Sequence, residues 1–243
     1  MIPILYEEPH FLLINKPAGL FSQAAGEIDS VQQRLIAQLK HRDQHPGEPF
    51  VGLPHRLDRG TSGVMLIARN QRALKRFGEQ FHSRKIDKRY LALVEGEYPC
   101  DTELWEDHLR KIDDHPQAEI VAAGTAGAKP ARASIQCLYR GEGTSLLQVQ
   151  LETGRMHQIR VQAAARGFPV VGDRMYGSRL EFAREAQAAA DDHPHPPLAL
   201  HAWALGFHHP QSARRMLVAV APPASWHTWA AGRWADGLPL PTG

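Results

Sequence analysis

The amino-acid sequence predicts an α+β fold built around a mixed, largely antiparallel sheet. Short apolar runs with β-branched members, at 64–68 and 91–94, have the length of buried strands. Two segments, 30–40 and 70–84, carry apolar residues at helical spacing. Alternating apolar and polar residues over 145–151, just after a Gly-containing turn, predict a hairpin. Because the chain contains both helices and hairpin strands, we expect helices and loops to flank this sheet.

Length and composition are those of an ordinary globular protein. Hydrophobic residues make up 43% of the 243 residues and charged residues 22%, so one large domain can bury a substantial core. Cys100 and Cys137 are too few for a disulfide framework or a zinc finger. The sequence shows no apolar run long enough for a bilayer and no secretory leader. We therefore expect a cytoplasmic protein that spans no membrane.

The charges are distributed unevenly although the net charge is only +2. Between Arg69 and Arg89 eight basic residues stand against Glu79 and Asp87. Between Glu95 and Glu119 nine acidic residues stand against two basic ones. A basic segment of this kind is consistent with a surface that binds a polyanion, although a solvated helix face is the more common explanation.

The first half of the chain is predicted to contain four strands and two helices. The helix at 70–84 has Ala73, Leu74, Phe77 and Phe81 along one face, which favours core packing of both phenylalanines. Pro17 and Gly19 keep 15–20 in a loop. The expected strands are 4–6, 11–14, 64–68 and 88–96, and the expected helices are 30–40 and 70–84.

The second half is predicted to begin with irregular structure or a hairpin over 98–129, where Pro and Gly interrupt an acidic stretch. A hairpin follows, and then a helix that starts near Thr153 and is ended by Gly167. The tail tryptophans Trp226, Trp229 and Trp234 are expected to pack against the domain rather than to contact a ligand. The other expected elements are hairpin strands 132–139 and 145–151, a helix at 180–190, and strands 198–207 and 216–220.

Three polar clusters lie next to predicted strands. Asp58 stands between Arg56 and Arg59 in His-Arg-Leu-Asp-Arg-Gly-Thr-Ser-Gly, just before a buried strand, which suits a held, ionised carboxylate. A charged surface loop is the alternative explanation. Tyr90 follows Lys88 and Arg89 at the entrance of another strand.

The third cluster, Arg155, His157 and Arg160, lies in the first turns of the helix predicted from Thr153. Free N–H groups at a helix start favour an anion there. Together the three clusters supply a carboxylate, an aromatic ring and cations beside a basic surface.

Three stretches of this sequence resemble the signature blocks of the RluA-type RNA pseudouridine synthases. They are His-Arg-Leu-Asp-Arg-Gly-Thr-Ser-Gly from His55, Lys-Arg-Tyr-Leu-Ala-Leu-Val-Glu-Gly from Lys88, and Thr-Gly-Arg-Met-His-Gln-Ile-Arg-Val from Thr153. The resemblance runs from about residue 2 to residue 220. It implies the pseudouridine synthase fold and one catalytic domain over 1–243. The Ile-Leu-Tyr-Glu block begins at residue 4, so we expect no RNA-binding appendage before it.

The resemblance also implies residue roles. Asp58 would be the catalytic carboxylate, Tyr90 the ring that stacks on the target base, and Arg155 the cation that pairs with Asp58. Arg56 would contact the RNA backbone or fill the space that a flipped base leaves. Arg160 is a lesser candidate for the ion pair. The implied RNA-binding residues are Arg56, Arg59, Lys88, Arg89, His157 and Arg160.

Two residues depart from the family pattern. Gly60 stands where an acidic residue is frequent, and Gln162 stands where His is common. Neither touches the implied chemistry, although both could alter RNA contacts.

The implied reaction converts a uridine in ribosomal or transfer RNA to pseudouridine, as one step of RNA modification. The N1–C1′ bond breaks, the uracil turns, and C5 bonds to C1′. No electrons enter or leave, so no cofactor is expected. We also expect the protein to be a monomer and its partner to be RNA. The carboxylate either adds to C1′ or removes the C2′ proton, and both routes stay open.

Two other functions each fit part of the sequence. An RNA-binding module without chemistry explains the basic segment, but it leaves Asp58 among arginines, where it would repel phosphate. A metal-dependent hydrolase is suggested by His193-Pro194-His195 and His208-His209. The chain lacks a His-Glu-x-x-His motif, and these histidines lie in Pro-rich loops.

Overall fold

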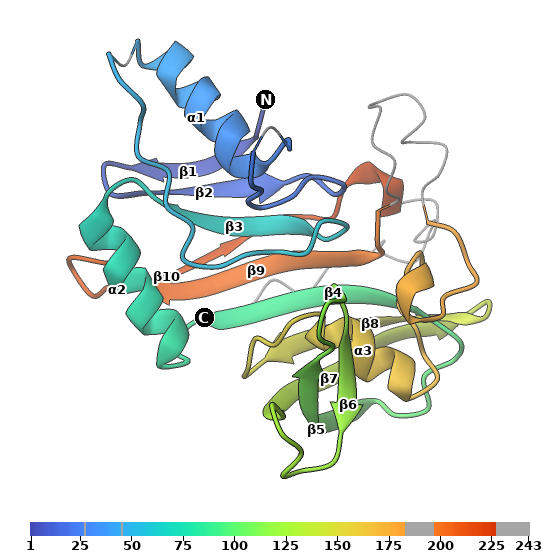
Figure 1. Cartoon of the computed structure of the whole chain (residues 1–243). Helices are drawn as coiled ribbons and strands as arrows, with labels where there is room; N and C mark the ends of the chain where they lie inside the picture. Colours follow the sequence, from blue (N-terminus) through green and yellow to red (C-terminus); the bar gives the residue numbers. More distant parts are fainter. Residues whose placement is uncertain (27, 45, 183–196, 227–243) are drawn as a thin grey trace. The chain divides into compact units, whose positions relative to one another are not determined.

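The protein has an α+β fold (Figure 1). The computed structural model describes residues 1–26, 28–44, 46–182 and 197–226, in which ten strands and three α-helices form. Two compact units make up this part of the chain. Of the described residues, unit 1 contains 1–87, 197 and 202–226, and unit 2 contains 88–182 and 198–201.

The strands of unit 1 place the Asp58 loop at the start of a fully buried strand. The segments β1 (Ile4–Glu8), β2 (Phe11–Lys16) and β3 (Ser62–Ala68) pair antiparallel in that order. β3 is followed in the sheet by β9 (Leu200–His208), which pairs antiparallel with β10 (Arg215–Ala219). A Cβ at Gly63 would clash with the carbonyl oxygen of Ala202, and Gly63 has φ +118°, so the motif requires glycine there.

Both helices of unit 1 begin at a side-chain cap. Ser30 caps α1 (Val31–Arg42) by accepting from the Gln33 N–H at 3.3 Å. Asn70 caps α2 (Gln71–His82) by accepting from the Ala73 N–H at 2.8 Å. Both helices were predicted from their apolar spacing, and both are confirmed within two residues at each end.

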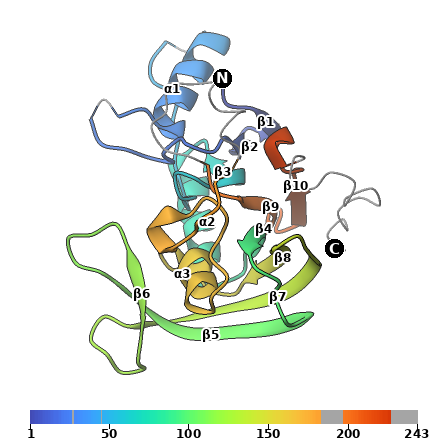
Figure 2. The same cartoon turned by 90° about the vertical axis from the view of Figure 1, so that its right-hand side faces the viewer.

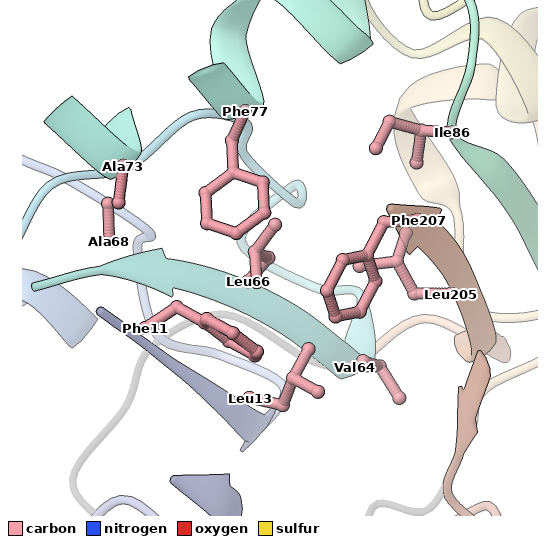
Figure 3. Close-up of a cluster of buried hydrophobic side chains, with 10 residues drawn as sticks. All are labelled: Phe11, Leu13, Val64, Leu66, Ala68, Ala73, Phe77, Ile86, Leu205 and Phe207. Carbon is pink, nitrogen blue, oxygen red and sulfur yellow. The ribbon is translucent and has the colours of Figure 1, made fainter. Parts of the chain in front are cut away.

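The core of unit 1 forms where α2 packs on β3 (Figure 3). Phe77 points from α2 toward Leu66 of β3 and toward Phe207 of β9. Its ring meets those of Phe11 and Phe207 edge to face, with centroids 5.6 and 5.8 Å apart. The core role predicted for Phe77 is confirmed, and this buried face turns the opposite, charged face of α2 outward.

Unit 2 is a run of antiparallel strands. Their order is β4 (Asp87–Glu95), β8 (Thr144–Leu151), β7 (Lys129–Gly141), β5 (Thr102–Lys111) and β6 (Ala118–Val121). Figure 2 shows the long, curved strands of this unit. Of the two structures expected over 98–129, the hairpin is the one that forms. The predicted β7–β8 hairpin closes through Glu142 and Gly143, which have φ 54° and 71° as a tight two-residue turn requires.

The helix predicted from Thr153 starts later than expected. α3 spans Gln158–Ala165, and Gly167, with φ 83°, follows its C-cap as predicted. The expectation that Arg155 and His157 lie inside the first turn is wrong. His157 is the N-cap residue, in the left-handed region at φ 51° and ψ 26°, and Thr153 to Met156 form the turn before it.

The C-terminal part brings the last described elements. Two short 3₁₀ helices span Arg174–Tyr176 (η1) and Ala224–Trp226 (η2), and Trp226 is buried. Leu180 to Phe182 are not helical, and the rest of the helix predicted over 180–190 lies outside the described residues, as do Trp229 and Trp234. In the described part of the chain, no helix has the length and apolarity that a bilayer crossing requires.

Candidate active site

Asp58 lies half-buried in a loop whose neighbouring residues are both anchored. On one side, the Leu57 N–H donates to Ser22 Oγ at 3.0 Å, and that hydroxyl donates to the Leu57 carbonyl at 2.7 Å. On the other side, Arg59 Nε donates to the Gly19 carbonyl and the Gly19 N–H donates to the Arg59 carbonyl, each at 2.8 Å. The loop 17–22 therefore holds the backbone on both sides of Asp58.

A buried ammonium group supports the same loop. Lys16 is fully buried, and its Nζ donates to the carbonyl oxygens of Pro17, Arg59 and Thr61 at 2.9, 3.1 and 2.8 Å. Burial lowers the pKa of Lys16 to about 7, the Asp58 carboxylate opposes this shift, and the Arg59 charge adds to it. The three carbonyls use the three N–H bonds of an ammonium.

Sequence reasoning did not single out Lys16. The available signal was a lysine that follows an apolar run and precedes Pro-Ala-Gly. Its side chain is on the same face of β2 as that of Ile14, because side chains two residues apart point the same way. Two of the three partners of its ammonium come from residues 43 and 45 positions away in the chain, which no local pattern reveals.

The arginines and histidine around Asp58 have different surroundings. His55 Nε2 accepts from the Leu66 N–H at 2.9 Å, and its ring stacks on Phe81 with centroids 4.6 Å apart. The Arg59 guanidinium lies 4.5 Å from the centre of the Phe21 ring, and burial lowers its pKa. Arg56 is exposed. Of these, Arg56 is therefore the best placed to meet a large ligand.

Tyr90 lies half-buried on β4, opposite Val149 of β8. Lys88 shares its face of the strand, because side chains two residues apart point the same way. Lys88 Nζ donates to the Thr153 carbonyl at 2.8 Å, whereas Arg89 lies on the other face. This bond connects the start of the Tyr90 strand to the turn that carries Arg155.

Arg155 lies half-buried in the turn from Thr153 to His157. Arg155 Nε donates to the Pro130 carbonyl at 2.9 Å. His157 Nδ1 lies 2.9 Å from the Tyr176 hydroxyl, which also accepts from the Ala118 N–H at 2.9 Å. The left-handed backbone of His157 thus has a side-chain contact that holds it in place.

Arg160 is part of the interior of unit 2. It is 7% exposed, and its Nε and Nη2 lie 2.6 and 2.9 Å from the two carboxylate oxygens of Asp173, which is 1% exposed. Tyr176 covers the guanidinium, with its ring centre 5.1 Å away. A guanidinium engaged by both oxygens of a buried partner has a structural role. This geometry favours a structural role for Arg160, and its contact with RNA or pairing with Asp58 stays a prediction.

The expected catalytic residues belong to different units. Asp58 lies in unit 1, and Tyr90 and Arg155 lie in unit 2. Lys88 Nζ and the Thr153 carbonyl bring the segments of Tyr90 and Arg155 together, while the Asp58–Arg155 ion pair stays a prediction.

Some of the histidines that suggested a metal-dependent hydrolase lie in the described part of the chain. His193 and His195 lie outside the described residues, and His209 Nε2 lies 2.6 Å from a Glu8 carboxylate oxygen. In the ranges that the structure describes, no three His, Cys, Asp or Glu side chains gather as they would around a metal ion.

Comparison with known proteins agrees with the sequence motifs. The family model described as RNA pseudouridylate synthase matches residues 10–165. Ribosomal large subunit pseudouridine synthase D of Nitrosomonas europaea is 35% identical over 216 residues, which are 89% of this chain and 60% of that protein. Ribosomal large subunit pseudouridine synthase C of Escherichia coli (strain K12) is 33% identical over 221 residues, 88% of this chain and 65% of that protein. The chain thus spans less than two thirds of the length of these two curated relatives.

Solved structures show the same fold. The human RNA pseudouridylate synthase domain containing 4 protein has a TM-score of 0.73 at 23% identity, over 93% of this chain and 92% of that one. The human RNA pseudouridylate synthase domain containing 1 protein has a TM-score of 0.67 at 26% identity, over 92% and 84%. With its three signature blocks in order, the chain belongs to the RNA pseudouridylate synthase family and is of the RluA type.

Proposed function

We propose that this protein is an RNA pseudouridine synthase that isomerises a uridine in structured RNA, with Asp58 as its catalytic carboxylate. The observation that carries the proposal is the anchoring of the Asp58 loop. Leu57 and Arg59 are hydrogen-bonded on either side of a half-buried carboxylate, in the first signature block of the family. Such rigidity suits a group that must meet one atom of its substrate.

The proposed reaction moves one glycosidic bond. The N1–C1′ bond breaks and the C5–C1′ bond forms, C5 loses its proton, and N1 gains one. Asp58 either adds to C1′ and is later displaced, or removes the C2′ proton and returns it. Neither route changes the oxidation state of the RNA overall, so the proposal needs no redox cofactor.

Tyr90 and Arg155 complete the proposed site. The target uridine has to leave its stack before a carboxylate can reach C1′. The half-buried Tyr90 ring would stack on the extruded base, a contact worth about 1–3 kcal/mol per base. Arg155 would pair with the Asp58 carboxylate while the base is absent.

The exposed basic residues of unit 1 would hold the RNA backbone. Arg56 is exposed next to Asp58, and the outer face of α2 carries Arg72 and Lys75. Arg84 and Lys85 follow that helix and are also exposed. Cations of this kind bind phosphate without reading sequence, so they orient the RNA rather than select the uridine.

The class of RNA is inferred from the relatives. The two curated relatives described above are named for the large ribosomal subunit, which makes its RNA the first candidate, and transfer RNA is the alternative. Action as a monomer in the cytoplasm is part of the same proposal.

A tritium-release assay tests the proposal in vitro. Large-subunit ribosomal RNA, transcribed without modifications and tritiated at uracil C5, loses tritium to water when C5 bonds to C1′. We expect release by the wild-type protein in the presence of EDTA. Asp58→Asn is expected to abolish release and to bind the transcript with nearly wild-type affinity. Release that needs a metal, or that survives Asp58→Asn, would contradict the proposal, and binding without any release would favour the RNA-binding module.

A further inference from the structure

We propose that Gln158 is a positioning residue for Arg155, acting through the backbone of the turn from Thr153 to His157. Since this inference concerns how the proposed synthase holds its cation, it rests on the proposed function. Gln158 itself is 3% exposed and is buried beneath the turn as the first residue of α3. It therefore cannot take part by touching RNA.

The side-chain amide of Gln158 connects three segments. Its Oε1 accepts from Thr153 Oγ1 at 2.7 Å and from the Arg155 N–H at 3.1 Å. Its Nε2 donates to the Arg132 carbonyl of β7 at 3.1 Å. Thr153 Oγ1 in turn accepts from the Arg132 N–H at 2.9 Å. The turn is thereby hydrogen-bonded to a central strand of unit 2 through the buried Gln158 amide and the Thr153 hydroxyl.

This arrangement requires an amide. An amide offers an acceptor oxygen and an N–H donor at once, and here both are used. A carboxylate at this position would place an acceptor against the Arg132 carbonyl. An apolar side chain would take away the Gln158 Oε1 acceptor of the Arg155 N–H, at the cost of losing that hydrogen bond.

The backbone conformation explains why the turn needs such support. His157 adopts φ 51°, a region that non-glycine residues rarely occupy, so the turn is not a low-energy extension of α3. The Tyr176 hydroxyl holds its far end through His157 Nδ1. Gln158 holds the near end, from which the Arg155 side chain projects.

Loss of the Gln158 hydrogen bonds would displace Arg155 and so lower kcat. A cation displaced by about 1 Å from its working position costs up to about a hundredfold in rate. The exposed cations proposed to hold RNA phosphates, Arg56 and those of 72–85, belong to unit 1, whereas the turn belongs to unit 2, so RNA affinity is expected to change little. The inference therefore predicts a loss in kcat with KM nearly unchanged.

Gln158→Met and Gln162→Met form a matched pair. Gln162 is also a glutamine of α3, but it is 0% exposed, which argues against the RNA contact considered for it, and its amide donates to Asp107 at 2.7 Å instead of to the turn. With the tritiated large-subunit transcript, we expect Gln158→Met to lower kcat on the order of ten- to a hundredfold and to leave KM within about twofold. Gln162→Met is expected to keep wild-type kcat. Equal losses of kcat in the two variants would overturn the inference.

A double-variant cycle separates positioning from general damage. If Gln158 acts through Arg155, then Gln158→Met adds no further loss to Arg155→Met, whereas independent effects multiply. A multiplied loss would reject the inference. Should Gln158→Met not fold, Thr153→Val removes the hydroxyl that bonds to Gln158 Oε1 and should lower kcat, whereas Thr153→Ser keeps the hydroxyl and should keep kcat.

Amide hydrogen exchange supplies a readout that needs no activity. The Arg155 N–H is protected by Gln158 Oε1, so its exchange is expected to speed up at least tenfold in Gln158→Met and to stay unchanged in Gln162→Met. Unchanged exchange in Gln158→Met would overturn the inference even in an active enzyme. A wild-type protein that releases no tritium would instead count against the proposed function, and the exchange result would stand by itself.

Discussion

Lys16 shows how much of the Asp58 loop depends on a single side chain. Its ammonium joins the end of β2 to the backbone on both sides of Gly60. A buried charge is costly unless its hydrogen bonds are satisfied, and here three carbonyls satisfy them. The family motif marks Asp58, but the residue that holds its loop stands 42 positions earlier in the chain.

The lowered pKa of Lys16 predicts a pH dependence of stability. Because its pKa is about 7 in the folded protein and 10.5 in the unfolded chain, the unfolded state binds more protons between these values. The free energy of unfolding should therefore rise with pH across this window, by up to about 1.4 kcal/mol per pH unit, and fall as the pH drops toward 7.

Lys16→Met isolates this effect. The difference in Tm between wild type and Lys16→Met, followed from pH 6 to 9.5, should shift in favour of the wild type as the pH rises. Parallel Tm curves for the two proteins would show that the folded and unfolded pKa values of Lys16 do not differ.

Arg160 leads to a prediction about stability instead of RNA binding. Arg160→Met leaves the Asp173 carboxylate buried without its cation, which should lower the free energy of unfolding by about 3–5 kcal/mol. Urea denaturation measures this loss. Arg160→Met/Asp173→Asn should recover part of it, because the uncompensated charge is gone. A single variant as stable as wild type, with weaker RNA binding, would restore Arg160 to the RNA-binding set.

At the scale of elements, α2 combines a core face with a cationic face. Its apolar residues pack on β3, while Lys75 is exposed in the basic segment. Lys111 is also an exposed lysine, in the acidic segment. If α2 contacts RNA phosphates, Lys75→Gln should reduce the slope of log K against log salt by about 0.7–0.9, and Lys111→Gln should not change it.

Fluorescence anisotropy of the labelled transcript at several salt concentrations gives these slopes. Identical slopes for Lys75→Gln and wild type would remove α2 from the proposed RNA surface.

The elements that were predicted well are those with a strong local pattern. The apolar stripe and the Asn70 cap define α2, and the uninterrupted apolar run defines β3. β5 was less well defined, because most of its side chains are polar and its strand geometry comes from pairing with β7. The predicted start of α3 was wrong because Met156 continues the helical spacing of apolar residues toward the N-terminus. Nothing in the sequence marks His157 as the left-handed residue that precedes the helix.

At the scale of the whole molecule, the α+β fold and the family could be predicted from the sequence. The three signature blocks mark Asp58, Tyr90 and Arg155 because these residues stand in unusual runs of residue types. Lys16 and Gln158 could not be found in this way. Their roles depend on carbonyl and amide groups that folding brings from distant segments, and a lone Lys or Gln carries no information about such partners.

The most direct test of the central claim is a map of pseudouridines in the total RNA of cells with the wild-type protein, with Asp58→Asn, or with no protein. The proposal predicts a site that is present with the wild-type protein and lost equally in the other two. A site that disappears in the deletion and returns with Asp58→Asn would contradict the catalytic role of Asp58. Identical maps in all three cells would contradict the synthase activity itself.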